Sequence, residues 1–204
     1  MQSMKEMSVY QGRRRIAVAL IIALLFFVLL FVRSAWPRGI HEYIEAFGLG
    51  FIMMAILGRM WCTLHIGGHK GATIIRSGPY SLSRNPLYVF STIGAFGIGC
   101  MTGSLGIALL LAVACYVTFM FVIIAEEGYL ENTFGQPYRD YKTEIPRFFP
   151  RFSGYKDVET LTIRPKTLYN TFFDGLVFFV AYPVFEFVEY LQSVGTIPVL
   201  LHVY

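Results

Sequence analysis

The sequence predicts an all-α fold: a polytopic transmembrane helix bundle of about five spans that forms a single membrane domain over residues 1–204. Two observations support this fold class. Charged residues make up 15% of the chain, whereas a soluble domain usually carries about 25%. The apolar residues also gather in long runs, which approach the roughly 20 residues that a helix needs to cross a bilayer.

Three apolar runs predict the first four spans. Residues 16–32 are 17 positions without a charge, and residues 43–62 are a second, mostly apolar run. Residues 87–125 are 39 positions without a charged side chain, which is enough for two helices of about 20 residues each. The tight turn between these two helices is expected at Met101–Ser104.

A fifth apolar run, Thr167–Leu191, is less uniform. Four residues interrupt it: Asp174, Pro183, Glu186 and Glu189. A carboxylate inside the hydrocarbon layer is costly and usually faces the bundle or water. Two interpretations therefore stay open. Either the whole run is a membrane helix, or the helix ends near Phe185 and leaves both glutamates outside the membrane.

The fourth span is predicted to continue beyond the membrane. Residues 126–134 contain one glycine and no proline, Gly135 suits a C-terminal cap, and Pro137 follows it as expected past a helix end. Residues 138–144 are expected to form a short second helix that stops before Pro146.

The distribution of basic residues predicts the topology. By the positive-inside rule, the N-terminus and residues 63–86 and 126–166 are cytoplasmic, and residues 33–42 and 102–104 lie on the far side. The net charge of +4 is then a topology signal and does not favour nucleic-acid binding. The chain is compact and has no recognisable retention signal, so a bacterial inner membrane is favoured over the endoplasmic reticulum.

Polar side chains are predicted to meet at the cytoplasmic end of the hairpin formed by spans three and four. Arg84 and Asn85 precede span three, and Glu126 and Glu127 end span four. Pro86 fits the first turn of a helix, whose free N–H groups and positive dipole end favour an anion beside Arg84. Adjacent acids on a helix point about 100° apart, so they either face different surroundings or are both solvated at the helix end.

Two motifs flank this hairpin. The first is Gly78-Pro79-Tyr80 with Arg84-Asn85-Pro86-Leu87-Tyr88, and the second is Glu126-Glu127-Gly128-Tyr129-Leu130 with Phe134-Gly135, Tyr138 and Tyr141. They resemble the signatures of the isoprenylcysteine carboxyl methyltransferase and phospholipid methyltransferase family of integral membrane methyltransferases. The resemblance covers a signature region at residues 73–150. The family often has histidine where Asn85 stands, so no base is assigned to this position.

The resemblance implies an S-adenosylmethionine-dependent methyltransferase with a cytoplasmic-side cofactor pocket. The acceptor would be lipophilic and enter from the bilayer: an isoprenylcysteine carboxylate, a lipid amine or a thiol. Arg84 and Glu127 are the expected catalytic residues, with Arg84 holding an anionic acceptor or orienting Glu127. Backbone N–H groups at 78–80 and at the start of span three would hold the cofactor carboxylate. The expected cofactor contacts are His69, Gly78, Pro79, Tyr80, Arg84, Asn85, Pro86, Tyr88, Glu126, Glu127 and Tyr138.

Other functions are weighed against this one. An NADPH-dependent membrane reductase of the sterol-reductase type would need more basic residues for a 2′-phosphate, and a non-catalytic membrane subunit or transporter would leave both motifs unexplained. His65 and His69 have the spacing of metal ligands on a helix, but the glycines around them favour a loop and no metal site is predicted. Residues 147–152 alternate basic and aromatic side chains, which is typical of an anchor in the headgroup layer.

Overall fold

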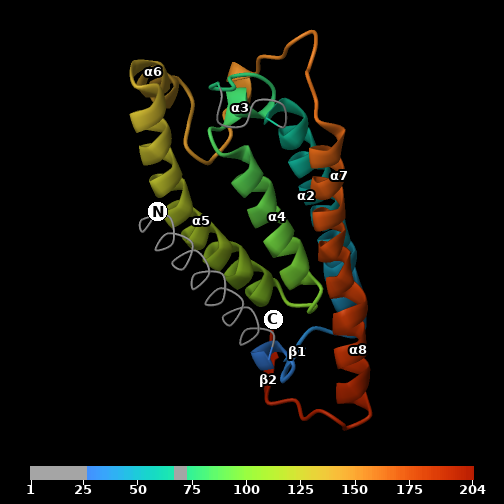
Figure 1. Ribbon diagram of the computed structural model, residues 1–204. Helices are drawn as coiled ribbons and strands as arrows, with labels where there is room; N and C mark the ends of the chain where they lie inside the picture. The colour runs from blue at the N-terminus through green and yellow to red at the C-terminus, as the bar shows by residue number, and fades with distance from the viewer. Residues whose placement is uncertain (1–26, 67–72) are drawn as a thin grey trace, which may run out of the picture.

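The computed structural model describes residues 27–66 and 73–204, and these residues are mostly helical (Figure 1). The elements in chain order are β1 (Val32–Ser34), α2 (Arg38–Ile66), α3 (Pro79–Leu82), α4 (Pro86–Cys100), α5 (Leu105–Phe134), α6 (Gln136–Glu144), η1 (Phe152–Gly154), α7 (Pro165–Leu176), η2 (Val177–Val180), α8 (Ala181–Ser193) and β2 (Leu201–Val203). The predicted helical membrane fold is confirmed.

Within the described residues, three helical stretches are long and apolar enough to cross a membrane: α2, α5 and the run from Pro165 to Ser193. The fourth apolar helix, α4, has 15 residues and a length of about 22 Å, which is shorter than the hydrocarbon core of about 30 Å. The first predicted span, residues 16–32, lies mostly outside the described residues. The number of five spans therefore stays a prediction.

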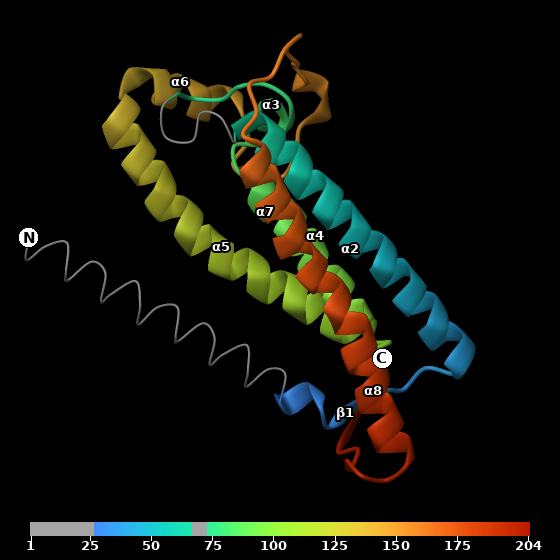
Figure 2. The same cartoon turned by 45° about the vertical axis from the view of Figure 1, so that its right-hand side comes forward.

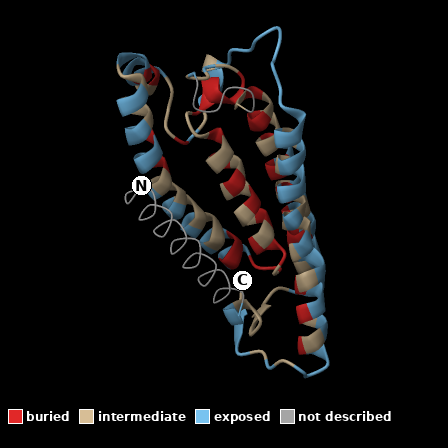
Figure 3. Cartoon of the chain, in the orientation of Figure 1, coloured by how far each residue is buried: buried red, intermediate tan, exposed pale blue. Residues whose placement is uncertain are grey.

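Close backbone contact between α2 and α4 fixes the centre of the bundle. A Cβ atom built on Gly97 would lie 2.8 Å from the Gly48 carbonyl oxygen, and one on Gly58 would overlap the Phe90 ring. Small residues allow membrane helices to approach in this way. Burial is concentrated along this contact, whereas the outer face of α5 is largely exposed (Figure 3).

The turn between α4 and α5 forms where it was predicted. Gly103 has a φ of +63°, which suits glycine, and the Ser104 side chain accepts a hydrogen bond from the Ile107 N–H at 3.2 Å as the N-cap of α5. The two helices are antiparallel, and in both views they diverge from the turn towards the end of the molecule where α6 lies (Figures 1 and 2). The start of α4 and the end of α5 therefore lie at the same end of the molecule.

The end of α5 also follows the prediction. The helix continues to Phe134, Gly135 caps it with a φ of +61°, and α6 then runs to Glu144. The second helix begins at Gln136 rather than at 138, because Pro137 occupies the first turn, where its missing N–H costs no hydrogen bond.

The helix of the fifth run does not end near Phe185, but the position of Glu186 and Glu189 relative to the membrane stays a prediction. The helix continues to Ser193, and Phe185 belongs to the buried core with α2 residues such as Ile52. Proline removes an intrahelical hydrogen bond, and the chain tightens into the 3₁₀ segment η2 just before Pro183. This local adjustment lets one long helix accommodate the proline.

A short parallel pairing of β1 with β2 was not predicted. Val32 pairs with Leu201 and Ser34 with Val203, at the end of the bundle opposite α3 and α6 (Figure 1). Three-residue strands are too short to give a periodic sequence signal.

Candidate functional site

A buried carboxylate lies between α4 and α5 at the α3–α6 end of the molecule. The Glu127 side chain is 3% exposed, and its oxygens lie 3.3 Å from Arg84 Nη1 and 3.0 Å from Arg147 Nε. The Asn85 amide donates a third contact at 3.2 Å. A buried anion is tolerated when it is paired and hydrogen-bonded in this way. We call Arg84, Asn85, Glu127 and Arg147 the Glu127 cluster.

The neighbouring acid points elsewhere. Glu126 is exposed, and the Tyr88 hydroxyl donates a hydrogen bond to its Oε2 at 2.8 Å. The Tyr88 ring in turn packs on Phe119 with centroids 4.7 Å apart. The interpretation that both acids are solvated is wrong for Glu127, because the helical rotation of about 100° turns it towards Arg84.

The segment after α6 folds back and supports the α3 region through backbone hydrogen bonds. The Arg84 N–H donates to the Pro146 carbonyl at 2.9 Å, and the Gly78 N–H donates to the Lys156 carbonyl at 2.7 Å. In the other direction, the Arg151 N–H donates to the Leu82 carbonyl at 3.0 Å. We call residues 145–157 the return loop.

These bonds correct one expectation. The N–H groups of Gly78 and Tyr80 were expected to hold the cofactor carboxylate, but Gly78 is bonded to Lys156 and Tyr80 donates to the Ser77 carbonyl at 3.2 Å. Pro79 has no N–H, and the Asn85 N–H donates to Ser83 Oγ at 3.2 Å. The return loop and local turns already use these donors, so they are not available to a ligand.

Gly78 allows α2 to approach the α3 region. Its φ is +56°, and a Cβ atom there would overlap the His65 ring. His65 is buried and lies in α2, not in the expected loop, with Nδ1 3.1 Å from the Trp61 carbonyl oxygen and Nε2 3.4 Å from Asp157 Oδ1. The ring therefore connects the end of α2 to the return loop. His69 lies outside the described residues.

Several buried polar atoms near the Glu127 cluster have no hydrogen-bond partner among the described residues. They are Nε and Nη1 of Arg84 and the hydroxyl oxygen of Tyr80. The Arg84 Nη1 contact with Glu127 is an ion pair without hydrogen-bond geometry. An unpaired buried polar group costs about 1–3 kcal/mol, and more when it is charged, so these atoms are candidates for ligand contacts.

Two tyrosines are neutral donors at this site. Burial raises the pKa of Tyr138 to about 12, with a further contribution from the Glu127 carboxylate. Burial also raises the pKa of Tyr80 well above its usual value. Both phenols are therefore protonated at neutral pH, and they can donate hydrogen bonds or pack against a ligand but cannot act as ready bases.

The structure brings most of the predicted site residues to one end of the hairpin. Arg84, Asn85 and Glu127 are in contact, Tyr138 is buried beside them, and Glu126 with Tyr88 forms the exposed side. Gly78, Pro79 and Tyr80 form the start of α3, and Pro86 begins α4. The catalytic roles of Arg84 and Glu127 stay predictions.

Sequence reasoning missed Arg147. It was assigned with residues 147–152 to a headgroup anchor, but it pairs with Glu127. A signal was present, because two adjacent acids at a helix C-terminus oppose the helix dipole and require positive charge nearby. Phe148 of the same segment is also buried, between α4 and α5 residues such as Val89 and Ile123.

The fold and the site together define a class of protein: a multi-pass helical membrane protein with a buried charged cluster at one end of a helical hairpin. A family model described as phospholipid methyltransferase matches residues 46–137, from α2 to the start of α6. The chain belongs to this family, as the two motifs predicted.

Three curated relatives were found. The chain is 33% identical to the cobalt-zinc-cadmium resistance protein CzcN of Cupriavidus metallidurans over 91% of its length and 86% of the relative. It is 32% identical to the nickel-cobalt-cadmium resistance protein NccN of Alcaligenes xylosoxydans xylosoxydans over 81% of its length and 78% of that relative. A protein-S-isoprenylcysteine O-methyltransferase of Schizosaccharomyces pombe is 30% identical over 40% of this chain and 35% of that protein. No solved structure matches the chain.

Proposed function

We propose that this membrane protein is an S-adenosylmethionine-dependent methyltransferase that methylates a lipophilic acceptor. The observation that carries the proposal is the side chain of Arg84, which is 8% exposed and whose Nε and Nη1 atoms make no hydrogen bond among the described residues, although Nη1 is ion-paired with Glu127. A fixed guanidinium with free N–H groups suits a carboxylate, which it can bind with two parallel hydrogen bonds. The family match supports the same assignment.

The residues present suit the amino-acid end of the cofactor, which carries a carboxylate and an ammonium group. Arg84 would hold the carboxylate. Glu126, which is exposed and accepts a hydrogen bond from Tyr88 at Oε2, would face the ammonium group. Glu127 is less suited to a cation, because two guanidinium groups already compensate its charge. Its role in this proposal is to position Arg84.

Alignment and exclusion of water supply most of the rate in such a reaction. The cofactor supplies a methyl group on a positively charged sulfur, which an acceptor thiolate, carboxylate or amine displaces in line. Buried Tyr80 and Tyr138 provide a dry wall, and Arg84 fixes one end of the bound cofactor so that the methyl group is directed at the acceptor.

The acceptor is proposed to come from the bilayer. Only 17% of the most apolar stretch of α5 is buried, and side chains such as Leu109, Val113 and Phe121 are exposed on it. Exposed apolar side chains on a membrane helix contact lipid, so a lipophilic molecule can reach the hairpin without crossing water. The basic residues of the return loop favour a cytoplasmic position of the site.

Thermal stabilisation in detergent tests the proposal. S-adenosylhomocysteine should raise the Tm of the full-length protein and NADPH should not. Stabilisation by NADPH alone would favour the reductase, and stabilisation by neither at saturating concentration would favour a non-catalytic subunit. Incubation of the purified protein with membrane extract and radiolabelled S-adenosylmethionine then identifies the acceptor.

Two variants test the proposed cofactor contacts. Arg84→Lys and Glu126→Gln should each weaken S-adenosylhomocysteine binding at least tenfold, about 1.4 kcal/mol, while 5′-methylthioadenosine, which lacks the amino-acid end, binds them like wild type. Equal weakening of both ligands would mean that the variants distort the site. Unchanged binding of S-adenosylhomocysteine would remove these residues from the cofactor site.

A second candidate function is a contribution to metal resistance, which the names of two relatives favour. Expression in a metal-sensitive bacterium should then raise the tolerated concentration of cobalt, zinc or cadmium. If the Arg84→Lys variant gives the same tolerance as wild type, the resistance does not depend on methyl transfer.

A further inference from the structure

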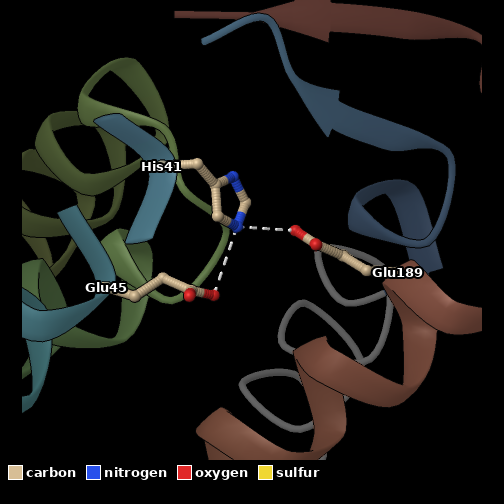
Figure 4. A group of neighbouring side chains, drawn as sticks. All are labelled: His41, Glu45 and Glu189. Atoms are coloured by element: carbon tan, nitrogen blue, oxygen red, sulfur yellow. Dashed lines mark ion pairs between the residues drawn. The ribbon is translucent and has the colours of Figure 1, made fainter. Parts of the chain in front are cut away.

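A second polar cluster lies at the opposite end of the bundle from Glu127, where α2 and α8 meet. His41 Nε2 is 3.3 Å from Glu45 Oε1 and 3.0 Å from Glu189 Oε1 (Figure 4). His41 and Glu45 are one helical turn apart and share a face of α2, and Glu189 reaches them from α8. One donor atom from each residue lies within 4.8 Å of the others.

A single hydrogen bond does not explain why the carboxylates of Glu45 and Glu189 both approach His41 Nε2. A ring nitrogen carries at most one N–H, which can point well at one acceptor. His41 Nε2 is buried, and it makes no hydrogen bond of good geometry among the described residues. A central cation accounts for this convergence, because all three donors then point to the same place.

The distances agree with a small transition-metal ion. Zn²⁺ binds imidazole nitrogen and carboxylate oxygen at about 2.0–2.2 Å, so neighbouring donors of a tetrahedral site are about 3.3 Å apart. The two observed separations from His41 Nε2, 3.3 Å and 3.0 Å, match this spacing. The spacing of each carboxylate from His41 Nε2 therefore suits the ion.

Burial and charge also favour a cation. The Glu45 side chain is 9% exposed, and its contact at hydrogen-bonding distance is with His41. A positive charge beside it, on a bound cation or on a protonated His41, offsets the cost of burying this carboxylate. The cluster opens into a pocket of about 480 Å³, where Arg38 is paired with Glu42 and Arg33 and Glu186 also line the wall. The pocket leaves room for water to complete the coordination.

The α4–α5 turn holds the histidine ring in place. Gly103 packs directly on the ring, where a Cβ atom would overlap His41 Nδ1. A fixed ring keeps Nε2 directed at the two carboxylates, which is the kind of outer support that metal-binding histidines usually have.

We propose that His41, Glu45 and Glu189 bind a divalent transition-metal ion of the zinc and cobalt class. One imidazole and two carboxylates form a donor set that suits these ions better than Ca²⁺ or Mg²⁺, which prefer oxygen ligands alone. Glu189 is 30% exposed, so the ion can enter from the pocket. Binding joins α2 to α8 and does not involve the proposed methyl-transfer site. The sequence predicted no metal site, since nothing in the spacing relates residue 189 to residue 41.

Metal titration of the chelator-treated, full-length protein in detergent tests this proposal. Wild type should bind one equivalent of Zn²⁺ by calorimetry, and Co²⁺ should give a visible absorption band typical of low coordination number. Glu45→Gln and Glu189→Gln should each lose at least tenfold in affinity. Glu186→Gln is the matched control, because it lies one turn away on α8 and lines the same pocket, and it should bind like wild type.

Two results would overturn the proposal. If wild type binds neither ion at micromolar concentration, the cluster is an ion pair between a protonated His41 and the two carboxylates. If Glu189→Gln and Glu186→Gln lose affinity equally, the pocket attracts cations by charge alone. Should Glu189→Gln fail to fold, Glu189→His supplies a new ligand at the same place, and it must retain binding of Zn²⁺.

Discussion

The Glu127 cluster permits a quantitative prediction about Glu127→Gln. The substitution removes one negative charge while leaving Arg84, whose side chain is 8% exposed, without compensation. Breaking a buried ion pair from one side typically costs about 3–5 kcal/mol. Arg147 adds little to this cost, because its side chain is 40% exposed and water can solvate it. We therefore expect a loss near the lower limit, about 3 kcal/mol.

Thermal unfolding in detergent measures this effect. For a chain of this size a loss of about 3 kcal/mol corresponds to a fall in Tm of roughly 6–12 °C. Glu126→Gln is the control, since Glu126 is exposed and its loss should change the Tm by about 2 °C or less. Adding Arg84→Gln to Glu127→Gln should restore part of the stability, because the uncompensated charge is then removed. Equal Tm values for the two single variants would refute the structural role of Glu127.

Three further predictions concern the surroundings of the site. Gly78→Ala should lower the Tm, because its φ of +56° and the His65 ring leave no room for a side chain, and adding His65→Ala should restore part of the loss. The raised pKa of Tyr138, about 12, means that an unfolded chain loses this proton first, so stability should fall as the pH rises above about 10, and Tyr138→Phe should make that fall shallower in pH-dependent unfolding. A cysteine at Asp140 should resist labelling from outside intact cells while one at Thr196 is labelled; the reverse result would refute the predicted topology.

The sequence was sufficient to predict the helical hairpin and most of its polar end. Uncharged runs, the Met101–Ser104 turn, and the Gly135 cap all act through local physical effects that can be read along the chain. The juxtaposition of Arg84 with Glu127 followed from the hairpin geometry, because a short turn places the two helix ends together.

The remaining contacts depend on parts of the chain that no local pattern relates. Arg147 reaches Glu127 because the return loop reverses direction after α6, and Glu189 reaches His41 because η2 lets one helix continue past Pro183. The expected role of the backbone N–H groups at 78–80 was wrong for the same reason. Donors that are free in an isolated segment were already bound by carbonyl groups, such as that of Lys156, from the return loop.

The return loop is attached to the α3 region by backbone hydrogen bonds, and this affects which sequence changes the loop can tolerate. Bonds such as those between Arg84 and Pro146 or Leu82 and Arg151 join main chain to main chain, and any residue other than proline can donate them. Phe149 and Phe152 of the loop are 73% and 76% exposed, so their side chains bear little of the support. Under the proposed function, substitutions at these exposed positions would alter which acceptors reach the site while the scaffold beneath keeps its shape and the charged cluster stays intact.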